Sequence, residues 1–540
     1  MQNQTPKSPK MPGQPLAAQA YLWLLGALVG VVVGFATLGF RQAILSIQGL
    51  AFGDGHERLA SIAANLPPYL LILIPFTGGC VVSLLLLFGQ KRGLLPEMRT
   101  HGVAEVIEAR ALDNARIRPG TGLLSAVITV VTLGTGGSSG REGPAVHIGA
   151  SLSAMVSSAL HLEPRDARTL LACGVAAAVA ASFNAPLAGM LFALEVVLGH
   201  YALRVMAPTA VAATVGAVIA REVLGAQPAF LLPAVPNVSL VDFPAAILLG
   251  VICAALAIVY SRSVLDGPSF VQARAERLKI PLWALPPLGG ALLGSMAIFV
   301  PEILGVGYEA TSMALSGHFA ILTLLVLIGA KILATTITLS FRLGGGIFSP
   351  SLFLGAMAGS TFGLMATVLF GADVTSSQFF AIIGMGAMSG AVLGAPISTT
   401  LIVFELTGSY EASIATLLAV SIATALSHSV LGGNIFHKQI EERGLYLREG
   451  PQRIILQTVR VREFMVALST HETTQEPTDT HLFEDDTLGR AMGLMEAEDM
   501  DRIAVRTRIG EQEIIGHANR QDALLAYNRR LIEEHEERHT

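Results

Sequence analysis

The stretch Gly140-Arg-Glu-Gly-Pro144 decides the fold, because it sets a glutamate and a proline directly before an uncharged apolar segment. That segment runs from Ala145 to Leu160, and His147 is its only titratable side chain. Proline is favoured in the first turn of a helix, where its missing N–H costs nothing. The stretch therefore predicts a helix that begins inside an apolar region, with Glu142 at its start. A carboxylate at membrane depth is costly, which points to a functional site.

A second stretch, Gly344-Gly-Gly-Ile-Phe-Ser-Pro350, predicts another helix start of the same kind. Here Ser349 is expected as the N-cap and Pro350 as the first helical residue. Two buried helix starts would each present free N–H groups and a partial positive charge, which together make an anion site from backbone. Glu142 would compete with the anion when charged and withdraw when protonated. The alternatives are that the glycines only permit close helix crossings, or that Glu142 only pairs with Arg141.

An internal repeat relates the two parts of the apolar region. Phe183-Asn-Ala-Pro186 and Leu393-Gly-Ala-Pro396 each begin a run that ends in glutamate nine residues after the proline. Glu195 and Glu405 are therefore 210 positions apart, as are Pro186 and Pro396. Duplicated halves in a membrane protein commonly place the substrate site at their interface near mid-bilayer. Glycine-rich breaks occur at residues 134–143, 305–307, 344–346 and 432–433, and they fit half-helices that meet around such a site.

Composition separates a membrane body from a polar tail. The chain has 540 residues, of which 14% are charged, against about 25% in soluble domains. Charged residues number 46 in residues 1–450, about 10%, and 29 in residues 451–540, about 32%. Leu22 to Phe40 and Tyr69 to Phe88 carry no charge and are long enough to cross a bilayer. We expect an all-α polytopic membrane protein with a small α/β tail.

Several other classes of protein are disfavoured. The net charge is −5 and the acidic excess lies in the tail, which argues against a nucleic-acid partner. Cys80, Cys173 and Cys253 lie singly in apolar runs, so neither a disulfide framework nor a metal site is expected, and no cofactor is expected in the membrane body. Gly137-Ser-Ser-Gly140 fits a pattern of intramembrane serine proteases, but no second motif supplies a base, so we expect no enzyme. The triplet Ala18-Gln-Ala20 precedes the apolar run, which is the wrong order for a signal peptide.

The motifs resemble those of the CLC family of chloride channels and chloride/proton antiporters. Gly140-Arg-Glu-Gly-Pro144 is similar to the family's gating-glutamate motif, and Gly346-Ile-Phe-Ser-Pro350 to its second filter motif. The run from Asn184 to Glu195 resembles the helix that follows the gate. The resemblance covers residues 22–444. It implies an inverted-repeat fold at residues 18–450, with halves at about 18–225 and 240–445.

The resemblance also implies the roles of the site residues. Glu142 would gate the pathway, and the backbone N–H groups of Ile347 and Phe348 would bind the anion. Arg141, Gly143 and Ser349 would line or support the pore. The family implication is a homodimer in a lipid bilayer, with one pore for chloride or another small anion in each subunit.

The first filter motif departs from the family pattern. The family has Gly-Ser-Gly-Ile-Pro-Glu, whereas residues 100–105 read Thr-His-Gly-Val-Ala-Glu. His101 takes the serine position, and Gly102 follows it at the expected anion site. A neutral imidazole donates one hydrogen bond and a protonated one adds charge, so anion choice and pH dependence are expected to be unusual. Alternatively, His101 turns towards a water-filled vestibule without touching the ion.

Two further departures concern proton coupling and the inner gate. The antiporters mostly carry a second glutamate immediately after the one that matches Glu195, but this chain has Val196. Valine resembles the channel branch, so we expect a passive chloride channel, and a chloride/proton antiporter that uses water or Glu195 is the alternative. The family's central-site tyrosine aligns with Phe436, and a slip of one residue would place His437 at the ion.

The tail and the termini are predicted separately. Residues 455–532 are similar to a single CBS module, which leaves nucleotide binding open, and residues 533–540 are expected to be a charged helix end. Residues 1–17 are expected to form a disordered arm. Its basic residues favour the cytoplasmic side, so both termini are expected there. A chain with one small tail module fits a multi-pass protein of a bacterial inner membrane.

Overall fold

The computed structural model describes residues 16–53, 55, 58–112, 115–225, 239–370, 376–446, 451–467, 480–508 and 514–539. Residues 1–15 of the expected arm lie outside these ranges, and the first helix begins at Leu16. Eight helical stretches of the described chain are long and apolar enough to cross a membrane. The predicted polytopic all-α architecture is therefore confirmed.

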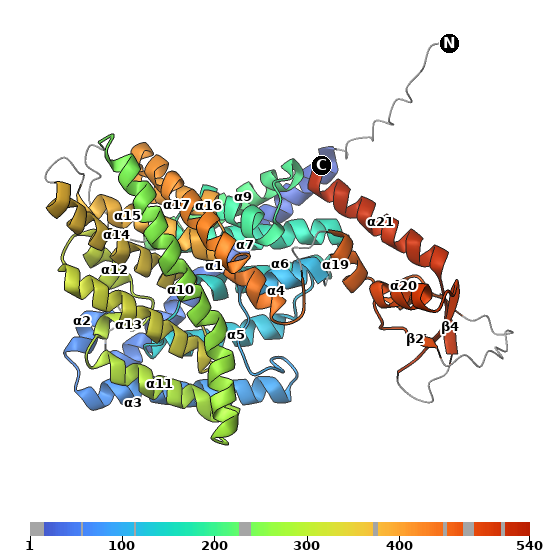
Figure 1. The fold of residues 1–540 in the computed structure, drawn as a ribbon, viewed down its shortest axis with the longest axis horizontal. Coiled ribbons are helices and arrows are strands. Elements are labelled where there is room, and N and C mark those ends of the chain that lie inside the picture. Colours follow the sequence, from blue (N-terminus) through green and yellow to red (C-terminus); the bar gives the residue numbers. More distant parts are fainter. Residues whose placement is uncertain are drawn as a thin grey trace, which may run out of the picture.

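The first half of the membrane body begins with the long helix α1 and ends with α9, coloured blue to green in Figure 1. The short helices α4 and α8 are flanked by longer ones. This half consists of α1 (Leu16–Phe52), α2 (Leu59–Ala64), α3 (Pro68–Lys91), α4 (Val103–Leu112), α5 (Pro119–Gly134), α6 (Glu142–Ala159), α7 (Pro164–Phe183), α8 (Pro186–Phe192), the π-helical turn η1 (Ala193–Leu198) and α9 (Leu203–Leu224).

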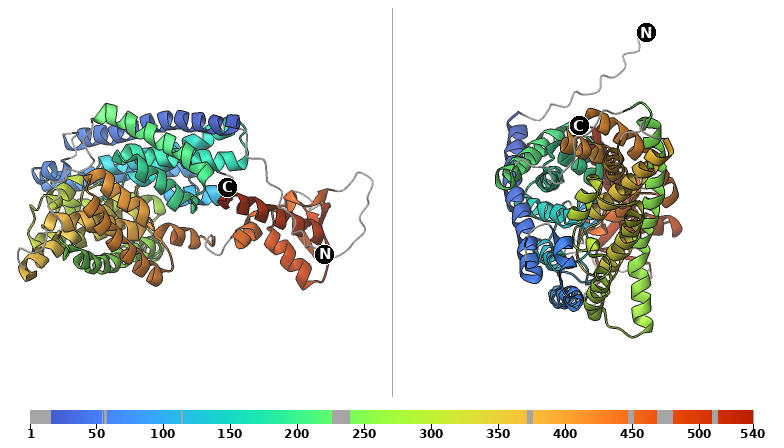
Figure 2. Two further views of the ribbon diagram at one scale, coloured as in Figure 1. Left: turned by 90° about the horizontal axis from the view of Figure 1, so that it is seen from above. Right: turned by 90° about the vertical axis from the view of Figure 1, so that its left-hand side faces the viewer.

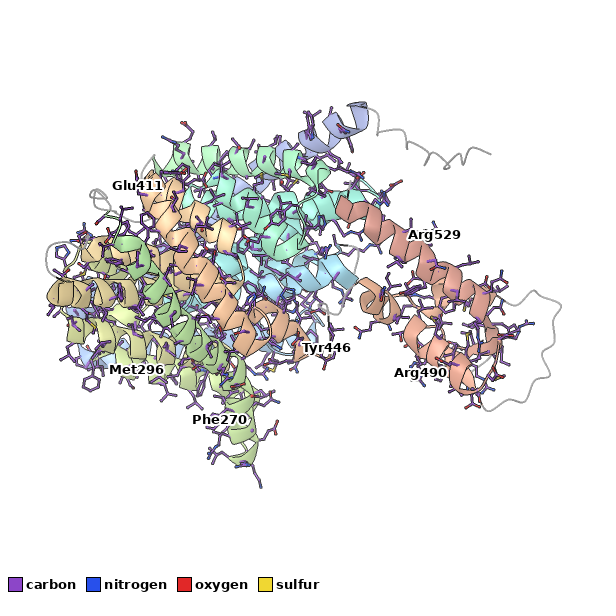
Figure 3. The ribbon with its side chains drawn as sticks, turned by 45° about the horizontal axis from the view of Figure 1, so that its top comes forward. Phe270, Met296, Glu411, Tyr446, Arg490 and Arg529 are labelled. Carbon is purple, nitrogen blue, oxygen red and sulfur yellow. The ribbon has the colours of Figure 1, made fainter. Side chains whose placement is uncertain are left out.

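The second half follows in green, yellow and orange and begins with another long helix, α10. The end of α10 that carries exposed Phe270 projects beyond the bundle (Figure 3). This half consists of α10 (Asp242–Arg277), η2 (Leu282–Ala284), α11 (Leu285–Ala297), η3 (Pro301–Ile303), α12 (Tyr308–Leu315), α13 (Ile321–Ser340), α14 (Phe348–Phe370), α15 (Ser377–Leu393), α16 (Pro396–Thr407), α17 (Tyr410–Leu431) and α18 (Ile435–Glu441).

Corresponding helices of the two halves pack in the same way. In the first half α6 crosses α7, and a Cβ added to Gly149 would lie 2.4 Å from the carbonyl oxygen of Gly174. In the second half α14 crosses α15, and a Cβ added to Gly355 would lie 2.2 Å from the carbonyl oxygen of Gly384. Only glycine permits backbones to approach this closely, as at small-residue crossings in membranes. The duplication predicted from the sequence is therefore present in the packing.

The tail is a small α/β unit with its own buried apolar core. Its sheet has the order β1-β4-β3-β2; β2 and β3 are parallel, and the other pairs are antiparallel. Figure 2 places the tail beside the bundle, and Figure 3 shows Arg490 and Arg529 on its helices α20 and α21. The elements are α19 (Pro451–Thr458), η5 (Val461–Glu463), β1 (Val466–Ala467), β2 (His481–Phe483), α20 (Leu488–Ala497), β3 (Arg502–Arg506), β4 (Ile514–Asn519) and α21 (Arg520–His539).

This arrangement is compatible with the CBS-like module expected from the sequence. Within it, α20 begins directly after its N-cap Thr487. The charged end predicted at residues 533–540 belongs to α21 up to His539.

Candidate anion-binding site

The two predicted helix starts lie against each other in the membrane body. The N–H of Gly140 donates to the carbonyl of Gly346, and the N–H of Gly346 donates back to Gly140, each at 2.7 Å. The Ser139 hydroxyl adds a bond of 3.0 Å to the carbonyl of Gly344. These bonds pin the loop before α6 to the loop before α14. Because backbone hydrogen bonds join the two loops, both helix starts face one shared space.

Ser349 differs from its predicted role. It was expected as the N-cap of a helix with Pro350 in first position, but α14 already begins at Phe348. The Ser349 hydroxyl donates instead to Oε2 of Glu142. The N-cap prediction was wrong because it weighed only the local sequence, and a buried carboxylate more than 200 residues away competes for the same hydroxyl.

Glu142 is buried at the start of α6, with 1% of its surface exposed. Its Oε1 accepts a 2.8 Å hydrogen bond from the Tyr308 hydroxyl, and its Oε2 accepts the bond from Ser349. Arg141 Nε is 4.0 Å from Oε1, the outer limit of an ion pair, and the guanidinium lies over the Tyr308 ring at 4.6 Å. Two hydroxyl groups therefore grip the carboxylate more closely than Arg141 does. The Arg141 guanidinium lies beside the carboxylate, and its expected contribution of positive potential stays a prediction.

A cavity of about 670 Å³ lies against Glu142 and collects most of the predicted anion-site residues. This cavity has charged, polar and apolar walls. The predicted residues in its lining are His101, Gly102, Glu142, Gly143, Ile347, Phe348 and Phe436. Arg141, Ser349, Glu195, Val196 and His437 are not among the lining residues. The sequence thus brought the right segments together, with the supporting residues set back from the cavity.

The N–H groups of Ile347 and Phe348 are open donors at the start of α14. Within the described residues no acceptor is bonded to either group. The Tyr260 hydroxyl donates to the carbonyl of Ile347 at 3.3 Å, and the Phe348 ring packs against Phe183 at 5.1 Å and Phe192 at 6.0 Å. These contacts fix the backbone direction. Unpaired N–H groups at a helix start are suited to hold an anion without trapping it with a full charge.

The loop that carries His101 is held by Glu105 of α4. Its carboxylate accepts bonds from the Gly102 N–H at 2.6 Å, from Arg99 at 2.7 Å and from Arg443 at 2.6 Å. Burial alone would raise the pKa of Glu105, but Arg443 and Arg99 lower it well below its usual range. Glu105 is therefore charged at neutral pH. Arg443 follows α18, so this carboxylate joins the first filter loop to the end of the membrane body.

His101 lines the cavity, and its backbone N–H donates to Ser125 Oγ at 3.1 Å. Its ring meets the ring of His147 edge to face, with 5.6 Å between the centroids. Burial lowers the pKa of His101 below its ordinary value, and Arg99 and Arg443 act in the same direction. The imidazole is therefore neutral at pH 7. As part of the cavity wall, the ring therefore supplies one N–H donor and no positive charge.

Glu195 has a structural task that the sequence did not reveal. Its carboxylate accepts bonds from the N–H groups of Ile397 at 3.1 Å and Ser398 at 2.8 Å, and from the Ser398 hydroxyl. Glu405 reciprocates by accepting from the N–H groups of two residues of α8, at 3.0 and 2.9 Å. Each glutamate thus caps the helix start of the opposite half. The nine-residue spacing from proline to glutamate in both repeats is the signal that could have predicted this exchange.

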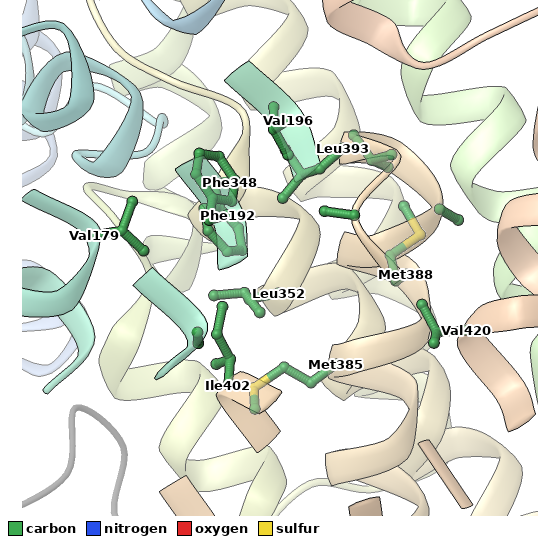
Figure 4. Close-up of a cluster of buried hydrophobic side chains, with 14 of the residues drawn as sticks. Val179, Phe192, Val196, Phe348, Leu352, Met385, Met388, Leu393, Ile402 and Val420 are labelled. Carbon is green, nitrogen blue, oxygen red and sulfur yellow. The ribbon is translucent and has the colours of Figure 1, made fainter. Parts of the chain in front are cut away.

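Val196 lies in an apolar environment. Its side chain is 3% exposed and belongs to a core cluster that also contains Phe192, Phe348 and Leu393 (Figure 4). A carboxylate at this position would have to be desolvated among hydrocarbon groups. The position at which the family's antiporters mostly place a proton acceptor is therefore filled by core packing.

Phe436 and His437 differ in their surroundings. Phe436 lines the cavity in the second position of α18, which fits the expected place at the inner gate. His437 is not among the cavity-lining residues. Its Nδ1 lies 2.7 Å from Asn434 Oδ1, and its backbone N–H donates to the same oxygen at 2.9 Å. The structure thus favours Phe436 over His437 as the residue at the cavity, because Asn434 holds the His437 ring at the helix N-cap.

Tyr308 is the main site residue that the sequence analysis missed. It begins α12 after a glycine-containing turn, and its hydroxyl reaches a carboxylate 166 positions earlier in the chain. The turn was recognised only as one of several glycine-rich breaks. The residue that directly follows such a break, at a new helix start, could have been examined in the same way as Glu142.

Comparisons with known proteins agree with this arrangement. A family model described as voltage gated chloride channel matches residues 78–428. That range is about two thirds of the chain and contains Glu142, the starts of α6 and α14, and the two capping glutamates Glu195 and Glu405. The chain belongs to this family.

Relatives in the family are named as channels and as exchange transporters. Chloride channel protein CLC-f of Arabidopsis thaliana is 31% identical over 433 residues, which are 74% of this chain and 53% of that protein. This chain thus spans about half the length of CLC-f. The H(+)/Cl(-) exchange transporter ClcA of Salmonella arizonae is 30% identical, covering 79% of this chain and 90% of ClcA.

A solved structure shares the fold. A slow cyanobacterial Cl-/H+ antiporter superposes with a TM-score of 0.69 and 22% identity, over 79% of this chain and 99% of that chain. The inverted-repeat helical architecture expected from the sequence is therefore confirmed.

Proposed function

We propose that this protein is a chloride channel that conducts passively through one gated pathway in each subunit. The observation that carries the proposal is the position of Glu142. Its carboxylate lies between the starts of α6 and α14, at the edge of a cavity whose wall includes Ile347 and Phe348. A small anion would meet the same helix starts that the carboxylate now faces.

The gate follows from competition between two anions for one place. A charged Glu142 keeps the place that chloride would take, since both are drawn to helix N-termini. Protonation removes that competition, and the side chain can then leave. Chloride would pass to the cavity along the backbone N–H groups of Ile347 and Phe348, with His101 and Phe436 on its walls. We therefore expect flux to rise as pH falls.

Two observations favour a channel over an exchanger. Val196 is packed in an apolar cluster, and both oxygens of Glu195 are engaged as a helix cap. Neither position offers a second carboxylate that is free to load protons. The alternative, a chloride/proton antiporter, is favoured by the similarity to ClcA and by the two histidines beside the cavity. It would need a proton path that uses neither residue 195 nor residue 196.

The test is reconstitution of the full chain into chloride-loaded liposomes, with chloride efflux and external pH recorded together. A channel gives chloride efflux with no linked proton movement. Proton uptake at a fixed ratio to chloride efflux would indicate an exchanger instead of a channel. In that case a proton ionophore should increase the chloride efflux. No chloride flux in either condition would direct the assay to other small anions, because His101 occupies the filter position of serine.

The assembly and the tail belong to the same proposal. We infer a homodimer in a bacterial inner membrane, with both termini in the cytoplasm and a tail that is able to bind a nucleotide. Mass measurement of the protein in detergent tests the dimer, and protease access from each side of sealed vesicles tests the termini. Titration with adenine nucleotides, followed by intrinsic fluorescence, tests the tail.

A further inference from the structure

The gate carboxylate is held from the second half of the chain by a phenol group. The Tyr308 hydroxyl donates to Glu142 Oε1 at 2.8 Å, and its side chain is buried, with 6% exposed. The Arg141 guanidinium covers the ring at 4.6 Å. The phenol therefore has a fixed direction. A hydrogen bond from a hydroxyl to a charged carboxylate is roughly twice as strong as a hydrogen bond between neutral groups.

The turn before Tyr308 is fixed by a buried lysine. Lys331 of α13 is fully buried, and its Nζ donates to the carbonyls of Ile303 at 3.0 Å and Gly305 at 3.1 Å. Gly307, with φ +92°, is the N-cap residue directly before Tyr308. Among the described residues, no carboxylate lies within ion-pair distance of Lys331. The Lys331 amine therefore donates its hydrogen bonds to the backbone of this turn.

The same turn is tied to the gate loop. The N–H of Gly305 donates to the carbonyl of Gly136 at 3.2 Å, four residues before Gly140. The Lys331 ammonium also lies 5.1 Å from the centre of the Phe353 ring in α14. Lys331 therefore contacts the turn before Tyr308 and the helix α14. The turn is itself bonded to the loop before α6, the helix that begins with Glu142. A lysine buried at this depth in a membrane body is costly, which calls for a function.

We propose that the Tyr308 hydroxyl is the latch that holds the Glu142 gate closed, and that Lys331 is the positioning residue that sets the latch. This inference rests on the proposed gating role of Glu142. The hydroxyl stabilises the charged carboxylate in the pathway over the protonated one, because a phenol donates most strongly to an anion. The latch therefore sets the pH at which the gate opens, while Ser349 holds the other oxygen.

The decisive variant is Tyr308→Phe, which keeps the ring under Arg141 and removes only the hydroxyl. Loss of a hydrogen bond to a charged group shifts an equilibrium by about tenfold or more. We expect the pH of half-maximal chloride flux into liposomes to rise by about one unit, since one unit is a tenfold change in proton activity. Tyr410→Phe, which changes an exposed tyrosine at the start of α17, is the matched control and leaves the midpoint in place.

A double-mutant cycle separates the latch from a general disturbance of packing. In the Glu142→Gln background, Tyr308→Phe has no charged carboxylate to release and is expected to leave the flux unchanged at every pH. Lys331→Met is expected to move the midpoint in the same direction as Tyr308→Phe, and the double variant to match Tyr308→Phe alone. Lys331→Arg keeps a donor and restores part of the wild-type midpoint.

The possible failures are distinguishable. If Glu142→Gln leaves the pH dependence intact, the proposed gate is wrong, and the latch falls with it. If Glu142→Gln abolishes the pH dependence but Tyr308→Phe leaves the midpoint within about 0.2 unit, the gate stands and the latch is overturned. Additive shifts from Tyr308→Phe and Lys331→Met would overturn the positioning role of Lys331 alone.

Discussion

Glu142 and the pair Glu195 and Glu405 are three carboxylates inside the membrane body, and each has both oxygens bonded. The partners differ in kind. Glu142 accepts from two side-chain hydroxyls, those of Tyr308 and Ser349. Glu195 and Glu405 each accept from two backbone N–H groups at a helix start of the opposite half, and Glu195 accepts in addition from the Ser398 hydroxyl. A hydroxyl can rotate away and take another acceptor, whereas a helical N–H cannot move without unwinding the helix.

On the proposed mechanism, we expect this difference to separate a carboxylate that moves from two that stay in place. Glu142 can exchange its hydroxyl partners for water or an anion at little cost in secondary structure. Release of Glu195 would leave two N–H groups at the start of α16 unsatisfied in a region with few water molecules. The reciprocal caps therefore hold the two halves together. Glu142, by contrast, is held only by hydrogen bonds from the side chains of Tyr308 and Ser349.

The largest expected effect comes from Glu142→Gln, which makes the gate permanently uncharged. A neutral amide does not compete with chloride for the helix starts, so flux at pH 7 should reach the wild-type level in acid and lose its pH dependence. Chloride efflux from liposomes between pH 4 and pH 8 measures this. Glu411→Gln, on the exposed first turn of α17 (Figure 3), is the control and should retain the wild-type profile. A pH profile that survives Glu142→Gln would remove the distinction between the moving and the fixed carboxylates.

Glu195→Gln tests the fixed class. The substitution sets an amide NH₂ group against the N–H groups of Ile397 and Ser398, so one buried donor is left unpaired. We expect a loss of about 1–3 kcal/mol in the free energy of unfolding. The pH dependence of the remaining flux should be unchanged, because this carboxylate does not line the cavity.

Thermal unfolding in detergent measures the stability, and Glu405→Gln should behave in the same way as its counterpart from the other repeat. The contrast fails if Glu195→Gln leaves the melting temperature unchanged while it alters proton movement. That outcome would make Glu195 a proton carrier and favour the antiporter.

The sequence predicted the parts of the site that are coded locally. Proline and glycine mark helix starts wherever they occur, so Gly140-Arg-Glu-Gly-Pro144 and the stretch before Pro350 located the two starts that meet at Glu142. The filter motif at residues 100–105 likewise placed His101 and Gly102 at the cavity. Motif spacing is preserved in the fold because each motif spans a single turn or helix end.

The partners across the fold could not be predicted in this way. Tyr308 is 166 positions from Glu142, and the donors to Glu195 are more than 200 positions away. Such pairs depend on how long helices pack, and one helical turn of displacement would change each of them. Lys331 shows the same limit, because a lysine in an apolar segment signals a function but does not name the carbonyls it will bind.

The smallest expected effect is on the chloride affinity, through the protonation of His101 in the cavity wall. Its pKa lies below the ordinary value of 6.5, chiefly because the ring is buried, with Arg99 and Arg443 acting in the same direction and Glu105 and Glu97 opposing them. The ring is therefore neutral at pH 7 and gains its charge only in acid. An added positive charge next to the anion should strengthen binding by about fivefold, the factor for about 1 kcal/mol. Chloride affinity should thus rise as the solution becomes acidic, and bound chloride should in turn favour the protonated ring.

His101→Gln keeps a hydrogen-bond donor but should abolish the rise in chloride affinity at low pH, here called the acid branch. Isothermal titration with chloride at pH 5 and pH 7.5 measures this affinity. The double variant with Glu142→Gln isolates the wall from the gate, because any remaining pH dependence then belongs to the histidines. His318→Gln, at an exposed site after α12, is the control and should bind chloride as the parent does. An acid branch that persists in His101→Gln but vanishes in His147→Gln would move the titrating ring one layer behind the cavity wall, to the partner that meets His101 edge to face. Neutral at pH 7, His101 would then act only as a hydrogen-bond donor, and the gate and the wall would depend on two separate proton sites.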